Sequence, residues 1–219
     1  MSETRIFKRK IYDRMLQWKQ ERDGKTALLV KGARRVGKST IAEEFARREY
    51  DSYLLIDFAS ASEEVKSLFN DLMDLDYIFL RLQAIYHVIL QERRSVIIFD
   101  EVQKCPLARQ AIKQLVKDHR YDYIETGSLI SIRKNTENII IPSEETRIDM
   151  FPMDYEEFRW ALGDTATVPL LRQFLTSTYH WGKPSERLCA ISVFICSSEV
   201  CPRLSMSILT PTIYVRSIR

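Results

Sequence analysis

The feature that most constrains this chain is a glycine-framed segment at residues 32–40, directly after the apolar run at residues 27–30. The pattern G-x-x-x-x-G-K-[ST] is matched by GARRVGKS, with an apolar strand pattern before it and a helical pattern after it. Such loops bind phosphates through backbone N–H groups at a helix amino terminus, where glycine permits close approach. The predicted phosphate-binding residues are Gly32, Ala33, Arg34, Arg35, Val36, Gly37, Lys38, Ser39 and Thr40.

Two side chains of this segment have expected roles. Lys38 is expected to reach the β- and γ-phosphates of a nucleotide and act in catalysis, and the hydroxyl of Ser39 is expected to bind Mg²⁺. The alternative is a glycine-containing turn between a strand and a helix that binds no ligand. Both flanks fit the phosphate loop, and this favours the nucleotide-binding interpretation.

A second acidic motif follows the apolar run at residues 96–99. Asp100 fits a Walker B aspartate that holds Mg²⁺ through its water shell, and Glu101 is expected to orient or deprotonate a water molecule in line with the γ-phosphate. The alternative is an acidic strand end that only caps the next loop. Together with the phosphate loop, the pair favours hydrolysis.

Further candidates lie at other predicted strand ends, where ligands bind in parallel sheets. Ser128 is a candidate sensor of the γ-phosphate and Thr126 a weaker one, although residues 126–128 also suit a plain turn. Asp57 is either a supporting residue or a cap. Three arginines are candidates for stabilising the transferring phosphoryl group, but solvated side chains are the favoured interpretation: Arg34, Arg35 and Arg147.

Apolar periodicity predicts an α/β fold, a P-loop NTPase three-layer sandwich with a parallel sheet of about five strands. Expected strands are 27–30, 53–56, 96–99, 123–128 and either 139–141 or 147–148. Expected helices are 6–21, 38–48, two within 62–92, one after Pro106, a short one at 129–133, then 154–162 and 170–175.

Four segments are expected: an amino-terminal helix (1–24), the P-loop core (25–150), a helical extension (151–182) and an atypical tail (183–219). The tail has seven Ser, three Cys and three Pro but no Asp, Asn, Gln or Gly. This composition suggests a frameshifted or truncated reading frame. The alternative is a natural, divergent tail.

Composition limits the other classes of function. Residues 183–219 carry five Lys/Arg against two Glu, which accounts for the whole net charge of +3, so charge alone does not indicate a nucleic-acid partner. The cysteine spacing gives no zinc or redox pair, and no apolar run is long enough for a membrane helix. We therefore expect a cytoplasmic protein whose ligands are ATP and Mg²⁺, with no membrane partner and with oligomers possible.

Several motifs together resemble the prokaryotic AAA-type ATPases that carry a carboxy-terminal domain of unknown function. They are the phosphate loop, DEVQ at residues 100–103 with Pro106 behind it, TGS at 126–128, and MFPMDYEEF at 150–158. The resemblance covers about residues 6–176 and implies an ATPase core of five parallel strands, with the second domain absent from this chain. Guanine recognition by an N-K-x-D run has no match, so ATP is favoured over GTP.

Three functions fit these residues. The leading hypothesis is a Mg²⁺-dependent ATPase that forms ADP and phosphate. The second is a binding switch in which ATP changes the chain's shape for a protein or nucleic-acid partner with little hydrolysis. A P-loop phosphotransferase ranks last, because no acceptor pocket or lid is recognisable.

Overall fold

The computed structural model describes residues 6–128 and 144–178. Its centre is a parallel sheet of five strands in the order β2-β3-β4-β1-β5. The strands are β1 (Ala27–Gly32), β2 (Ser52–Asp57), β3 (Ser95–Asp100), β4 (Asp122–Ser128) and β5 (Glu145–Met150). The predicted α/β fold with five parallel strands is confirmed. Of the two alternatives for the fifth strand, 147–148 is correct, and 139–141 lies outside the described residues.

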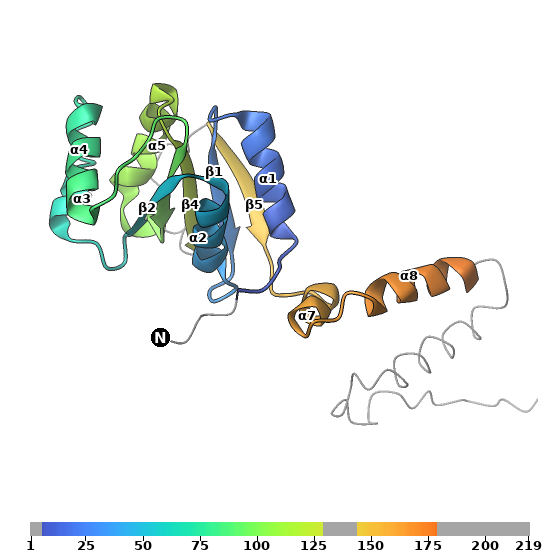
Figure 1. The fold of residues 1–219 in the computed structure, drawn as a ribbon. Helices are drawn as coiled ribbons and strands as arrows, with labels where there is room; N and C mark the ends of the chain where they lie inside the picture. Colours follow the sequence, from blue (N-terminus) through green and yellow to red (C-terminus); the bar gives the residue numbers. More distant parts are fainter. Residues whose placement is uncertain (1–5, 129–143, 179–219) are drawn as a thin grey trace, which may run out of the picture. The chain divides into compact units, whose positions relative to one another are not determined.

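Helices cover both faces of this sheet (Figure 1). One face carries α1 (Ile11–Arg22) and α2 (Lys38–Glu49), and the other carries α3 (Glu63–Ser67), α4 (Leu75–Tyr86) and α5 (Pro106–Asp118). A 3-10 helix, η1 (Val102–Lys104), connects β3 to α5, and α7 (Tyr155–Ala161) follows β5. All of these elements belong to one compact unit that ends at Asp164, whereas α8 (Thr167–Thr178) belongs to a second.

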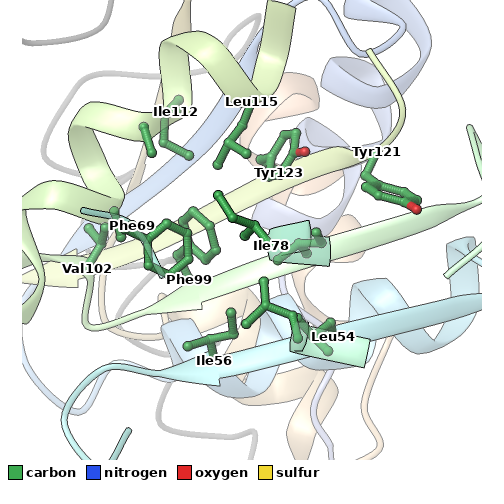
Figure 2. Close-up of a cluster of buried hydrophobic side chains, with 14 of the residues drawn as sticks. Leu54, Ile56, Phe69, Ile78, Phe99, Val102, Ile112, Leu115, Tyr121 and Tyr123 are labelled. Atoms are coloured by element: carbon green, nitrogen blue, oxygen red, sulfur yellow. The ribbon is translucent and has the colours of Figure 1, made fainter. Parts of the chain in front are cut away.

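Two apolar cores hold the layers together. The core under α1 and α2 is built around Met15, Phe45 and Val30, all essentially inaccessible to solvent. The opposite core joins β2, β3 and β4 to α4 and α5, and Figure 2 shows Phe99 and Ile78 within it. The strands β3 and β4 are buried at every position because helices cover them on both faces.

Local pattern and structure differ in a few places. The helix expected from Ile6 begins only at Ile11, and Glu44, expected on the outer face of α2, is buried and paired with Arg48. Ile89 is 81% exposed and lies beyond α4, whose C-cap residue His87 has a left-handed conformation. The strand β2 is only half buried at alternate positions because it lies at the sheet edge. The expected short helix at 129–133 falls outside the described residues.

None of the helices in residues 6–128 and 144–178 combines the length and apolar character that crossing a bilayer requires.

Candidate functional site

The carboxyl ends of the central strands bring the predicted site residues together. Because β4 lies between β1 and β3, the end of β4 separates the phosphate loop from Asp100. The register pairs Gly32 on β1 with Ser128 on β4 and with Met150 on β5. The site is therefore assembled along the carboxyl ends of the strands, where ligands of open parallel sheets bind.

Glycine is required at both fixed positions of the loop, for two different reasons. A Cβ added to Gly32 would lie 2.2 Å from the carbonyl oxygen of Met150, so the neighbouring strand excludes any side chain there. Gly37 has a φ of +94° and occupies the N-cap of α2, a backbone conformation that other residues rarely adopt. The loop therefore leads directly into the first turn of α2.

The Lys38 side chain is buried against the loop that carries it. Its Nζ donates hydrogen bonds to the carbonyl oxygens of Ala33, at 2.7 Å, and Gly32, at 3.4 Å. Burial lowers the pKa of Lys38, while the nearby carboxylates of Glu101 and Asp100 act in the opposite direction. The ammonium thus lies between the loop and the two acidic residues, as a phosphate-binding lysine should.

The carboxylate of Asp100 accepts two hydroxyl hydrogen bonds on the same oxygen. Ser39 Oγ donates to Asp100 Oδ1 at 2.7 Å, and the buried hydroxyl of Thr126 donates to it as well. Two oxygens that bind one Mg²⁺ side by side are separated by about 2.9 Å, given Mg–O distances near 2.0–2.1 Å. The Ser39 and Asp100 oxygens therefore fit a shared Mg²⁺.

Glu101 adopts an unusual backbone conformation at the end of β3. Its φ of 51° lies in the left-handed region, and its N–H donates to Thr126 Oγ1 at 3.3 Å. One carboxylate oxygen, Oε2, accepts a hydrogen bond from the side-chain amide of Gln103. Sequence reasoning noted the DEVQ run but gave Gln103 no role, and it ranked Thr126 below Ser128.

Arg9 was missed altogether, although it supports the phosphate loop directly. Its guanidinium is buried and donates to the carbonyl oxygens of Val36, at 3.0 Å, and Phe151, at 2.6 Å. The same group forms an ion pair with Glu157, at 3.2 Å. No local pattern marks Arg9, because its partners lie up to 148 positions away along the chain. The only signal was indirect, the acidic run at 154–157.

The remaining candidates are distributed as follows. Ser128 is buried at the end of β4, and Arg34 and Arg35 are exposed on the loop. The Asp57 carboxylate accepts hydrogen bonds from Ala59 N and Ser60 Oγ, which is capping geometry. Arg147 pairs with Glu145 at 2.5 Å and lies three residues before the end of β5, so it is not brought to the site.

A sequence model described as an AAA domain matches residues 24–159. The chain belongs to the AAA domain family. AAA domains are nucleotide-binding domains of the ATPase type, and the matched segment runs from just before β1 into α7. No curated protein matches the chain. A structure of C. elegans PCH-2 is similar with a TM-score of 0.35 and 10% identity, over 75% of this chain and 44% of that one, so the chain spans less than half of that structure.

The AAA domain has a hollow of about 260 Å³ beside its phosphate loop. Apolar side chains from the segment before α1 and from the end of β5 line it, among them Ile6, Phe7 and Met150, together with Arg9 and Arg35. Gly37 and Thr40 form its border with the loop.

Proposed function

We propose that this chain binds ATP together with Mg²⁺ and hydrolyses it to ADP and phosphate. One observation carries the proposal: the phosphate loop lies next to two consecutive carboxylates. The 2.7 Å hydrogen bond from Ser39 of the loop to Asp100 joins the two segments. A phosphate loop alone would support binding only. A carboxylate positioned next to the metal ligands adds the group that hydrolysis needs.

The phosphates are held by the loop and by Lys38. We assign the backbone N–H groups at the amino terminus of α2 to the phosphates, and the Lys38 ammonium adds a positive charge. Ser39 and Asp100 would hold Mg²⁺, which neutralises charge on the phosphate oxygens when bound. We assign the γ-phosphate contact to Ser128, which is paired with Gly32 across the sheet.

Glu101 is the residue we assign to water activation. Its carboxylate accepts a proton from the water whose oxygen attacks the γ-phosphorus, while the bond from that phosphorus to the bridging oxygen breaks and ADP leaves with the electron pair. We assign the proton to Oε1, since Oε2 already accepts a hydrogen bond from the amide of Gln103.

The base of the nucleotide is assigned to the apolar hollow. Ile6, Phe7 and Met150 offer the nonpolar contact that an adenine ring needs. Together with the missing N-K-x-D run, this supports ATP over GTP as the substrate. The finer resemblance to prokaryotic members with a second domain remains a prediction.

The test is steady-state phosphate release with ATP and with GTP, with Mg²⁺ and with excess chelator, on wild-type protein and on Glu101→Gln. The amide of glutamine keeps the shape but accepts no proton, so we expect unchanged ATP affinity and turnover slower by at least about 100-fold. Glu92→Gln is the matched control, because Glu92 is exposed near the opposite end of the same strand. Normal turnover in Glu101→Gln would show that another group activates the water.

The alternative is an ATP-dependent binding switch, in which ATP binds with little hydrolysis. The same assay separates the two functions: tight ATP binding by the wild-type chain without phosphate release would indicate a switch for a protein or nucleic-acid partner.

A further inference from the structure

We propose that Gln103 is a positioning residue whose amide holds the Glu101 carboxylate in the orientation that activates water. The inference rests on the proposed hydrolysis, and it assigns a role to a residue two positions beyond the base. Gln103 lies in η1, is 4% exposed and donates its Nε2 hydrogen bond to Glu101 Oε2.

The backbone between the two residues explains how they meet. Strand β3 ends at Asp100, and the left-handed conformation of Glu101 turns the chain directly into η1. The N–H of Lys104 then donates to the carbonyl oxygen of Glu101 at 2.9 Å, which closes the turn. Extended strands place side chains two positions apart on one face but about 7 Å apart along the chain. The turn shortens this separation to hydrogen-bonding distance.

The segment that carries the Gln103 amide is anchored in the apolar core. Val102 is fully buried and lies beside Phe69 and Phe99 in the core shown in Figure 2. Cys105, on the other side of Gln103, is 5% exposed, and its N–H donates to Val102 at 3.0 Å. Because Gln103 is itself buried, it does not have the rotamer freedom of a surface side chain. The amide is therefore held in place before any substrate binds.

An amide donor suits this role better than a charged donor would. Glutamine is uncharged at every pH, so it orients a carboxylate without forming the ion pair that makes a carboxylate a weaker base. Its Nε2 donates to Oε2, and we assign the other carboxylate oxygen, Oε1, to the proton from water. Thr126 fixes the same residue at its backbone, since its hydroxyl accepts the Glu101 N–H. Glu101 is thus held at two points from two different elements.

The opposite role, an inhibitory latch that keeps Glu101 away from water, predicts the opposite sign. A latch that is removed should release the carboxylate and raise turnover. A positioning contact that is removed should lower turnover while leaving substrate binding unchanged, because the rotamer of the base no longer matches the transition state.

The experiment uses the full chain with Gln103→Met, which keeps the length and removes the donor, and Gln103→Glu, which adds a second carboxylate. Lys104→Met is the control, because Lys104 is the exposed neighbour in the same helix. Phosphate release gives kcat and KM for ATP. For Gln103→Met we expect kcat to fall about tenfold with KM within twofold.

Gln103→Glu should also lower kcat, because a second carboxylate repels the Glu101 carboxylate and donates no hydrogen bond when ionised. Raised or unchanged turnover in Gln103→Met would overturn the proposal. If wild-type protein binds ATP and releases no phosphate, the proposed hydrolysis fails instead. A crystal structure of Gln103→Met then decides separately, by whether the Glu101 carboxylate keeps its orientation, whether Gln103 acts on Glu101.

Discussion

The two halves of the site are built from different kinds of contact. On the phosphate-loop side, positively charged side chains hold main-chain carbonyl groups: Lys38 contacts Ala33 and Arg9 contacts Val36. On the carboxylate side, contacts run between side chains, from Ser39 and Thr126 to Asp100 and from Gln103 to Glu101. The first half depends on backbone shape and the second on individual functional groups.

This difference predicts a division of labour between affinity and turnover. A loop that presents backbone groups binds phosphates in the ground state and the transition state alike, so damage to it should appear mainly as lost ATP affinity. Side chains that orient a metal ligand and a base act mainly in the transition state, where charge is redistributed. Damage to them should appear mainly in kcat. Substitutions on each side test whether the division is real.

The largest effect is expected for Lys38→Ala on the phosphate-loop side. Without the ammonium, the phosphate charge is balanced by backbone dipoles and the metal alone, and we expect ATP affinity or kcat/KM to fall by at least about 100-fold. Calorimetric titration with ATP and phosphate release measure both. Lys25→Ala, an exposed lysine before β1, is the control. Unchanged binding and hydrolysis in Lys38→Ala would place the nucleotide elsewhere.

On the carboxylate side, Thr126→Val should lower kcat about tenfold with ATP affinity nearly unchanged. Valine matches the shape of threonine but removes the donor to Asp100 and the acceptor for Glu101 N–H, so both acidic residues lose a fixed contact. Thr126→Ser keeps the hydroxyl and should restore most of the rate. A loss of ATP affinity in Thr126→Val without a loss of kcat would break the proposed division.

A smaller effect on affinity is expected for Arg9→Met. Methionine keeps the apolar stem but leaves the buried Glu157 carboxylate and two carbonyl groups without their cation, so the Kd for ATP should rise several-fold. The free energy of unfolding should fall by roughly 3 kcal/mol. Urea unfolding and ATP titration measure the two effects. The exposed Arg14→Met in α1 should change neither, and equal values for both variants would show that Arg9 does not support the loop.

The smallest effect concerns Glu125, one residue before Thr126 on β4. Burial raises its pKa to about 8, the Glu145 carboxylate acts in the same direction, and neither carboxylate oxygen has a hydrogen-bond partner. Since the unfolded carboxyl ionises near 4.5, stability is lost as pH rises from about 4.5 to 8. Glu125→Gln should reduce the difference in unfolding free energy between pH 5 and pH 8 by roughly 1 kcal/mol or more. Equal pH dependence in both proteins would show that Glu125 is ionised in the fold.

Most of the fold could be predicted from local pattern because its strands are continuous apolar runs. Residues 27–30 and 96–99 read as strands buried on both faces, and the structure confirms both. The errors fall where distant partners decide. Arg9 and Lys10 belong to the expected first helix but lie before α1, where Arg9 contacts Phe151 and Lys10 contacts Glu157. No periodicity within residues 6–21 can show these distant contacts.

About as much of the candidate site as of the fold could be predicted from the sequence. The phosphate loop is contiguous, so its spacing alone indicates how it folds. The partners of the acidic pair come from η1 and β4, and the distance from Thr126 to Asp100 depends on which strands are neighbours in the sheet. Local sequence indicates that Asp100 and Glu101 end a strand. It does not indicate that Gln103 and Thr126 hold them.

The Arg9 contacts also bear on the order in which the molecule folds. Its hydrogen bond to Phe151 joins positions 142 residues apart, and the neighbouring Lys10 N–H reaches Glu157 across 147. Closing so long a loop adds little to the equilibrium cost, about 0.6 kcal/mol for each doubling of length, but contacts of high sequence separation form slowly. The phosphate loop therefore gains its Arg9 support only after β5 and α7 are in place. During synthesis on the ribosome, ATP binding should be acquired late, well after the glycine loop itself has been made.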